Sequence, residues 1–558
     1  MRPLVAGLLL CAAASAGGGP ETTLLVVNAA SPMSRLVANE YAALRDIPRA
    51  HVVLLDGVPL HGAVPLDLFL ARIWNPVAAH MKEQGLEGQI DLVVYSVDFP
   101  FAVEFGDKGV PYGGRASLTG LTFLIRKVEA EEPFWLLDAS PYYAFAARPG
   151  PARSATAEER GFLARAQGAI KVKQWSEAAA AYEAFLKTYD THAASWYDLA
   201  CCLARLGKVE GALDALAKAI DHGFPDGAHA MQDPDLASLR STPRFAQQIA
   251  RLKPSRGYRA QDGGCLSTQL GYTGRYGSSV PEVLAALKAS VAADGTAPDG
   301  TVYFCRNGDI RSTTREPGWP ALEAALKQRG RKVEILDGVL PEGKDDVIGA
   351  ILGTQSFSWA SSKSTILPGA IVEHLTSHGG DFAHGGQTKL SELVRFGAAG
   401  ASGTVMEPYA IQAKFPHPMI HAFYADGCSL AESFFLSVHG PYQLMVAGDG
   451  LARPFARFEK VAIDAPPMPW TGTVRIGGGT EVWVDGRRIE GFDLDTKKLD
   501  DGWHEVRVVK VKDDAIATRS FKKLDAVVRN RDRSVAITGG PGGIEAKCAG
   551  AKGFRLMD

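Results

Sequence analysis

The first part of the chain alternates short apolar runs with longer amphipathic segments. Thr23–Asn28, His51–Asp56 and Ile90–Ser96 are apolar runs of the length expected for buried strands. Between them, Met33–Arg45 and Leu66–Gln84 repeat apolar residues at helical spacing. Strands that alternate with helices of this length predict a parallel sheet covered by helices on both faces. An α/β subdomain is therefore expected over residues 22–150.

Residues 156–250 change to an alanine-rich helical pattern that repeats at about 34 residues. Phe162 corresponds to Trp196 in the second copy, and Ala166 corresponds to Ala200. Small residues interleaved with large ones at helix contact points are typical of helical hairpins that stack on one another. The segment resembles a pair of tetratricopeptide repeats, and the resemblance implies a protein or peptide partner. A spacer or packing module is the alternative interpretation.

The α/β pattern returns over residues 260–455 and gives way to short alternating runs over residues 466–558. The last region, with its Asp-Gly turns, predicts a small antiparallel β-sandwich of the immunoglobulin-like kind. In the α/β part the expected strands are Thr301–Cys305, Lys332–Leu336, Val347–Leu352, Gly403–Met406 and Tyr442–Ala447, and the expected helices are Trp319–Arg329, Thr388–Phe396 and Ser429–Val438.

Composition limits the classes of function. The chain has 558 residues, 46% of them hydrophobic, so several globular domains are expected. Its 60 basic and 62 acidic residues give a net charge of −2, which argues against a nucleic-acid partner. No apolar stretch beyond the N-terminus is long enough to predict an integral membrane span. The turn after the first strand lacks a Gly-rich phosphate loop, so no nucleotide cofactor, and no other cofactor, is expected.

The N-terminus has the pattern of a secretory signal peptide. Arg2 precedes the apolar run Leu4–Ala13, and Ala14-Ser15-Ala16 is a small-residue cleavage signal. Residues 1–16 are therefore predicted to be a leader, and the protein is expected to be exported to the periplasm, the cell surface or the medium. Cys11 offers a lipoprotein alternative. The remaining six of the seven cysteines lack the spacing of a disulfide scaffold or a zinc site.

The second α/β part contains blocks that carry a family resemblance. The blocks are Leu367-Pro368-Gly369-Ala370-Ile371, His374-Leu375-Thr376-Ser377, Gly397–Thr404, Glu407-Pro408, Lys414-Phe415-Pro416 and Gly448-Asp449. Together with the N-terminal α/β segment, they resemble a family of secreted bacterial proteins that is similar in layout to the gingipain branch of the caspase-like cysteine peptidases. The resemblance covers residues 22–130 and 260–455, with the helical repeats inserted between them, and implies a caspase-like parallel-sheet core.

The same resemblance implies where catalytic residues would lie. Gingipain-like enzymes place a His-Gly pair at the end of one central strand and the nucleophilic cysteine at the end of the next. Here Gly353-Thr354-Gln355 stands at the first place and Ser377 at the second. A serine hydroxyl without a positioned base is a poor nucleophile. We therefore expect a degenerate peptidase core that binds a peptide-like or small polar ligand, in a pocket of Gly353, Thr354, Gln355, Ser377, His378 and Glu407.

Three arrangements would restore catalysis or add a metal. Cys428, at the start of a predicted helix, could pair with His378, because helix N-termini lower the pKa of a thiol. Ser377 could use His374 or His384 as its base. These two dyads define the alternative function, an active cysteine or serine peptidase. In the third arrangement, His378, Asp381, His384 and Glu407 could bind a metal ion, although no His-Glu-x-x-His motif accompanies them and no metal is the preferred expectation.

The signal-peptide prediction is directly testable. When the full chain is expressed in a secreting bacterial host, N-terminal sequencing of the mature protein should begin near Gly17. An intact Met1, or a lipid attached to Cys11, would contradict it.

Overall fold

The protein divides into two compact units, each with a hydrophobic core of its own. The larger unit is formed by Met1–Phe458 with Lys512–Arg519, and the smaller by Glu459–Val511 with Ser520–Asp558. The predicted leader, including Cys11, lies outside the described residues. The computed structural model describes residues 18–105, 114–130, 140, 142–144, 156–222, 224, 230–231, 233–251, 265–407, 410–512, 518–531, 535–540 and 543–548.

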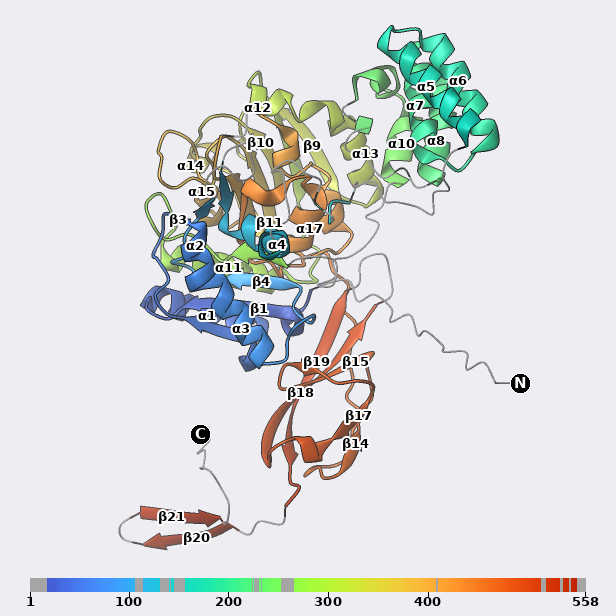
Figure 1. Cartoon of the computed structure of the whole chain (residues 1–558). Helices are drawn as coiled ribbons and strands as arrows, with labels where there is room; N and C mark the ends of the chain where they lie inside the picture. Colours follow the sequence, from blue (N-terminus) through green and yellow to red (C-terminus); the bar gives the residue numbers. More distant parts are fainter. Residues whose placement is uncertain are drawn as a thin grey trace, which may run out of the picture. The chain divides into compact units, whose positions relative to one another are not determined.

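Both α/β segments contribute strands to one ten-stranded, mostly parallel sheet in the larger unit (Figure 1). The α/β core with additional domains that the sequence predicts is therefore confirmed. The segments meet where β4 pairs in parallel with β7, and β13 runs antiparallel to β12. In spatial order the strands are β2 (Val52–Leu55), β1 (Thr23–Asn28), β4 (Leu92–Tyr95), β7 (Leu266–Gln269), β13 (Leu444–Gly448), β12 (Gly400–Thr404), β11 (Ile366–Leu375), β10 (Val347–Gly353), β8 (Thr301–Arg306) and β9 (Lys332–Asp337).

Several predicted strands differ from the observed ones by a residue or two at their ends, and two are offset along the chain. The predicted strand Gly403–Met406 is β12, which begins at Gly400. Its glycines do not give the apolar pattern of a strand, but they allow close packing of the backbone. A Cβ on Gly403 would lie 2.4 Å from the backbone of Gly379. The other strand begins at Leu444 instead of Tyr442, because Pro441–Gln443 forms a 3₁₀ turn. Hydropathy therefore located both strands but not their first residues.

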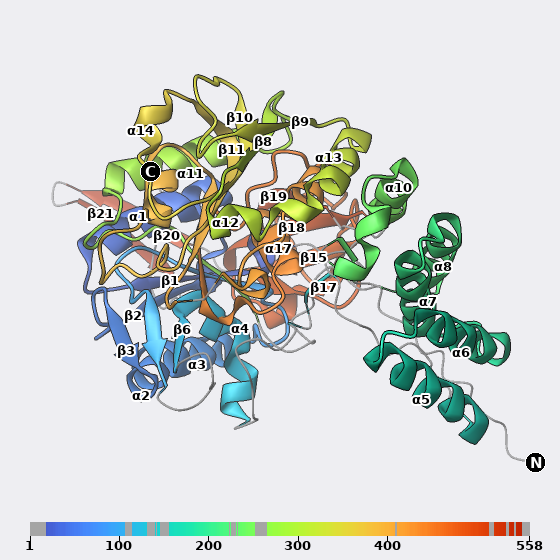
Figure 2. The same cartoon turned by 90° about the horizontal axis from the view of Figure 1, so that it is seen from above.

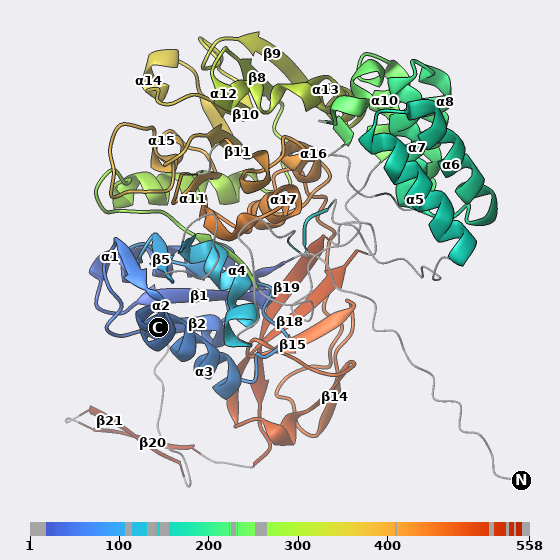
Figure 3. The same cartoon turned by 45° about the horizontal axis from the view of Figure 1, so that its top comes forward.

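Helices cover both faces of the sheet (Figure 3). The first of them, α1, begins where Ser31 Oγ accepts a hydrogen bond from Ser34 N at 3.0 Å, and it ends at Asp46 in the left-handed conformation. On one side α1 (Pro32–Arg45), α11 (Val280–Ala293) and α15 (Leu390–Arg395) form a contacting row. The other side carries α3 (Asn75–Glu83), α4 (Leu118–Glu129), α13 (Trp319–Gln328), α16 (Ile420–Ala425) and α17 (Leu430–Ser437).

Shorter elements complete the core. The predicted helix Leu66–Gln84 is a continuous run of α2 (Leu66–Phe69), one π turn and α3. A separate three-stranded sheet consists of β3 (Ala63–Pro65), β5 (Ala102–Glu104) and β6 (Arg115–Ser117). Two further elements are the short helices α12 (Ile310–Thr313) and α14 (Trp359–Ser362).

The inserted segment is helical and its helices stack in chain order (Figure 2). Ala166 and Ala200, which the repeat pairs with each other, are fully buried, and so are Ala178 and Ala212. A side chain this small lets neighbouring helices approach closely. The predicted joints at Arg148–Arg153 and Lys253–Gly257 lie outside the described residues. The helices are α5 (Ala157–Lys171), α6 (Trp175–Thr188), α7 (Ala193–Arg205), α8 (Val209–Asp221) and α10 (Pro243–Arg251).

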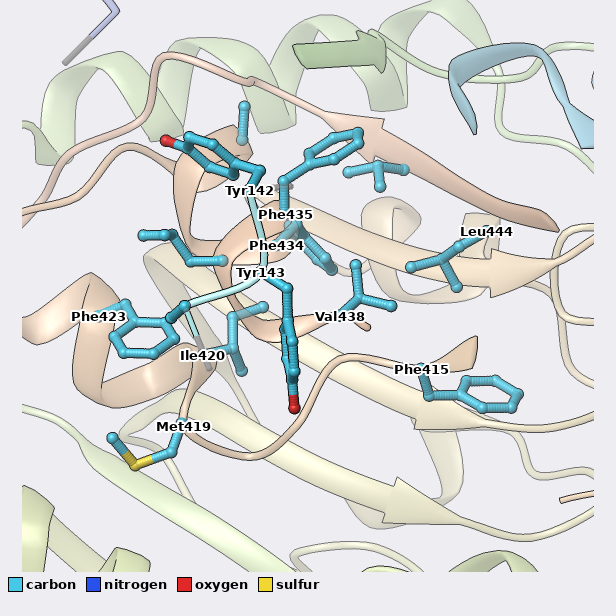
Figure 4. Packing of buried hydrophobic residues seen from close by; sticks show 14 of the residues in the cluster. Tyr142, Tyr143, Phe415, Met419, Ile420, Phe423, Phe434, Phe435, Val438 and Leu444 are labelled. Atoms are coloured by element: carbon cyan, nitrogen blue, oxygen red, sulfur yellow. The ribbon is translucent and has the colours of Figure 1, made fainter. Parts of the chain in front are cut away.

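The short described stretch between α4 and the helical segment is anchored on α17. Ser140 N donates to His439 O at 2.7 Å, and Ala144 N donates to Leu436 O at 2.9 Å. Between these bonds Tyr142 and Tyr143 are buried among the apolar side chains of α16 and α17 (Figure 4). Apolar burial therefore fixes the chain on the core before the helical segment begins.

The smaller unit is antiparallel, as the sequence predicts. Trp470 is buried in its core, and its indole Nε1 donates to Pro466 O at 2.9 Å. Among the described residues of the protein, no helix is long and apolar enough to cross a bilayer. The strands are β14 (Thr473–Arg475), β15 (Glu481–Val484), β16 (Arg487–Arg488), β17 (Asp493–Asp495), β18 (Gly502–Val511), β19 (Arg519–Val528), β20 (Val535–Gly540) and β21 (Gly543–Cys548).

A buried carboxylate joins elements from both α/β segments of the larger unit. Asp449, directly after β13, accepts hydrogen bonds from Tyr41 Oη at 3.0 Å, Arg45 Nε at 3.0 Å and Ser290 Oγ at 2.9 Å. Arg45 also pairs with Asp294. Burial and the Asp449 carboxylate raise the pKa of Tyr41 well above its usual value. The network therefore links α1 and α11 to the central antiparallel pair of strands.

Removing the charge of Asp449 should strongly destabilise the larger unit. Asp449→Asn leaves the Arg45 guanidinium buried without its main counter-charge, which typically costs about 3–5 kcal/mol. Urea denaturation followed by tryptophan fluorescence measures the loss. The matched control is Asp493→Asn, because the Arg475–Asp493 pair is exposed, and exposed pairs contribute about 0–1 kcal/mol. Equal effects of the two substitutions would contradict this role for Asp449.

Candidate functional site

The structure brings together the two strand ends that the sequence singled out. β10 and β11 pair in parallel, with Gly353 opposite Leu375. Beyond the strands, Gln355 O accepts a hydrogen bond from Thr376 Oγ1 at 3.3 Å. Gly353-Thr354-Gln355 therefore lies beside the segment that contains Ser377 and His378.

A buried arginine, Arg315, binds both strands near these ends. Arg315 donates to Leu352 O at 3.2 Å, to Pro416 O at 2.7 Å and to the Glu373 carboxylate at 3.2 Å. The side chains of Arg315 and Glu373 are fully buried. Because breaking a buried ion pair is costly, the ends of β10 and β11 are held in one relative position.

Ser377 has no base in position to activate it. Thr404 Oγ1 donates to the carbonyl oxygen of Ser377 at 2.9 Å, which fixes the backbone. None of the described residues forms a hydrogen bond with the Ser377 hydroxyl, and neither His374 nor His384 does so. The structure thus places Ser377 at the predicted strand end without completing a serine dyad.

His378 lies between two carboxylates. Its Nδ1 is 3.3 Å from Asp381 Oδ2, and its Nε2 is 3.8 Å from Glu407 Oε2. The backbone N–H of His378 donates to Gln387 Oε1, and its carbonyl accepts from Lys389 Nζ at 2.7 Å. Burial lowers the pKa of Lys389. These bonds fix the backbone of His378, and its side chain, which stays 29% exposed, lies between the two carboxylates.

Asp381 is the centre of a group that we call the Asp381 cluster: Arg115, His378, Asp381, His384 and Glu407. The buried Asp381 carboxylate accepts from His384 Nδ1 at 2.8 Å and lies 3.8 Å from Arg115 Nη1. All four residues of the metal alternative are thus neighbours in this cluster. Even so, no set of three or more histidine, cysteine or acidic side chains within the described ranges is arranged to hold a metal ion.

His374, the other candidate base, lies inside the protein. Its ring packs edge-on against Phe357, with centroids 4.8 Å apart, and no described residue bonds either ring nitrogen. Burial, assisted by Arg315, lowers the pKa of His374 to about 3. An imidazole without access to solvent or to Ser377 cannot exchange protons with a substrate.

Cys428 lies far from His378. The Leu430 side chain packs at Gly400, where β12 begins, whereas Thr404, where β12 ends, contacts Ser377. At about 3.3 Å per residue, the length of β12 separates the two places by about 13 Å. Burial also raises the pKa of the Cys428 thiol well above its usual value. Cys428 is a free thiol, as are Cys201, Cys202 and Cys305.

A second histidine–carboxylate group, not predicted from the sequence, follows β1, β4 and β7. We call Ser31, His61, Asp98 and Thr273 the His61 cluster. His61 Nε2 lies 2.9 Å from Asp98 Oδ1, and both Ser31 and Thr273 donate hydroxyl hydrogen bonds to the same carboxylate. Burial alone would raise the pKa of Asp98, but hydrogen bonds from His61, Ser31 and Thr273 outweigh it and hold the pKa at about 2. Asp98 directly after a predicted strand was the signal that could have indicated this site.

An aromatic stack connects the two clusters. Tyr272 follows β7, and Phe382 follows Asp381. Their rings stack with centroids 3.9 Å apart, and the His61 ring packs edge-on against Tyr272 at 5.2 Å. Both Tyr272 and Phe382 are buried. The segments after β4, β7 and β11 are therefore packed against one another through a buried aromatic stack.

Comparison with known proteins adds no assignment to this geometry. Neither a protein-family model nor a curated protein sequence matches the chain. The α/β fold and the residues at the strand ends are therefore the features that indicate a function.

The buried histidines should make the larger unit sensitive to acid. His374, His417 and His421 all have a pKa lowered to about 3, chiefly by burial, from an ordinary value of 6.5. Their imidazoles stay neutral in the folded chain but take up protons below about pH 6.5 once it unfolds, so stability is retained above pH 6.5 and lost as the pH falls toward 3. Each histidine should reduce the free energy of unfolding by about 2 kcal/mol between pH 7 and pH 5.

Denaturation of His374→Leu at the two pH values tests this account. The acid-induced loss of stability should be smaller than in the unsubstituted protein by about 2 kcal/mol. His222→Gln is the control, because His222 is an exposed residue of the helical segment. An unchanged pH dependence in His374→Leu would contradict the assignment.

Proposed function

We propose that the chain is an exported binding protein whose caspase- and gingipain-like core recognises a peptide-like or small polar ligand without cleaving it. The ligand surface comprises the Asp381 cluster together with Thr354, Gln355 and Ser377. The inserted helices, taken as a tetratricopeptide pair, would add contacts to a protein partner.

The observation that carries the proposal is the pairing of an oriented, partly exposed imidazole with a serine that has no base. Asp381 and Glu407 flank His378, and Ser377 precedes it in the chain. Peptide hydrolysis needs a nucleophile whose proton passes to a neighbouring base. Ser377 has no such neighbour in the described part of the chain, so the polar groups of this surface can bind but not cleave.

The exposed groups match the chemistry of a peptide. The Glu407 side chain is 41% exposed and accepts hydrogen bonds, whereas the Arg115 side chain is 24% exposed and donates them. Peptide groups carry one donor and one acceptor each. A surface that presents both kinds of partner around fixed backbone can therefore bind a short extended chain.

Replacing Ser377 should weaken binding without abolishing any turnover. Ser377→Ala removes one neutral hydrogen-bonding group, worth about 1 kcal/mol, and should weaken binding of capped tetrapeptides about fivefold. Isothermal titration with an equimolar mixture of N-acetylated, C-amidated tetrapeptides measures the change. Cys428→Ala, which alters a buried residue near the opposite end of β12, is the matched control and should bind like the unsubstituted protein.

The hydrolase alternative is tested on the same proteins. Native protein treated with a fluorophosphonate and with iodoacetamide should show no modification at Ser377 or Cys428 in peptide mass maps. Cleavage of a peptide or ester by the unsubstituted protein, lost in Ser377→Ala or Cys428→Ala, would overturn the binding proposal in favour of a peptidase.

A further inference from the structure

We propose that an extended ligand bound at the Asp381 cluster also reaches the His61 cluster, at the other end of the buried aromatic stack, where His61 accepts a hydrogen bond from a peptide N–H of the ligand. This inference depends on the proposed function, because it names a second subsite for the same ligand. The ligand class is a peptide of at least three or four residues.

In the His61 cluster, one nitrogen of the imidazole is bonded to a carboxylate, and the other is not bonded by any described residue. Asp98 is buried and ionised, so it accepts the hydrogen bond from His61 Nε2, and that nitrogen carries the proton. Nδ1 is then the acceptor nitrogen, and no described residue bonds it. The His61 side chain is 32% exposed. An oriented acceptor at the surface is suited to a ligand N–H group.

The backbone of the cluster is held in an uncommon conformation. Asp98 and His61, which contact each other, have φ values of 62° and 57°. Non-glycine residues rarely adopt positive φ, and such positions are concentrated at functional sites. The backbone at Gly274 lies close to the rings of Tyr272 and His61, since a Cβ on Gly274 would lie 2.8 Å from Tyr272 and 2.9 Å from His61. The surrounding chain thus fits tightly around the His61 ring.

The separation of the two clusters sets the length of the ligand. The His61 ring lies 5.2 Å from Tyr272, and Tyr272 lies 3.9 Å from Phe382, the residue after Asp381. An extended peptide advances about 3.3 Å per residue. Three or four residues are therefore needed to contact His61 and the Asp381 cluster at once, whereas a dipeptide contacts only one of them.

The test compares ligand length in matched variants of the full chain. The probes are capped dipeptide and capped tetrapeptide mixtures, titrated against the unsubstituted protein, His61→Ala and Gly274→Ala. Loss of one hydrogen bond should weaken tetrapeptide binding about fivefold in His61→Ala, with dipeptide binding unchanged. Gly274→Ala, which displaces the His61 ring, should have the same selective effect. The control is His504→Ala, because His504 is also held by a carboxylate, Asp485, but belongs to the smaller unit.

Histidine-selective ¹³C labelling separates the two possible failures. The ring resonances of His61 and His378, assigned through their glutamine variants, should both shift when the tetrapeptide mixture is added. A shift of His378 without a shift of His61, or equal weakening for both ligand lengths, overturns the second subsite and leaves the proposed function intact. No binding of any peptide to the unsubstituted protein overturns both.

Discussion

The buried Asp449 carboxylate is the interaction on which the arrangement of the larger unit depends. Its hydrogen bonds reach Tyr41 and Arg45 on α1 and Ser290 on α11. These helices come from chain segments on either side of the helical insertion, so one charged group joins parts that the backbone does not connect directly. Such a network stabilises the structure only when each polar group has a partner. The β13–β12 pair is thereby fixed against both helices, and with it the strand ends that carry the candidate site.

The two clusters at these strand ends share one design. In each, a buried carboxylate is hydrogen-bonded to an imidazole that is partly open to solvent: Asp381 accepts from His384, and Asp98 accepts from His61. His378 lies beside Asp381, with its Nδ1 3.3 Å from the carboxylate. A carboxylate in this position selects the tautomer and orientation of the ring. The same design would serve proton transfer if a nucleophile were bonded to the free nitrogen. Among the described residues Ser377 makes no such bond, which supports the proposal that the clusters serve recognition rather than acyl transfer.

The sequence predicted the elements that are continuously apolar and missed those that are not. Thr23–Asn28 was recognised because a strand buried on both faces contains an uninterrupted apolar run, here Leu24–Val27. β7 was not predicted, because Ser267, Thr268 and Gln269 are buried polar residues without the pattern of a strand. For the site, Ser377 and Gly353 could be placed together from the order of the strand ends. His61, Asp98 and Thr273 could not, because their contact depends on β7 lying beside β4, which no local pattern encodes.

The pairing of β4 with β7 also constrains how the chain acquires its structure. β4 ends at Tyr95 and β7 begins at Leu266. The whole helical segment is therefore synthesised after β4 and before β7, although these two strands lie side by side in the sheet. Contacts so distant in sequence form slowly, because a long loop must close first. Until then the edge of β4 exposes unpaired backbone groups that can pair with another chain. Helices α5 to α8, which pack on their neighbours in the chain, can fold during this interval and shorten the effective distance that the loop must close.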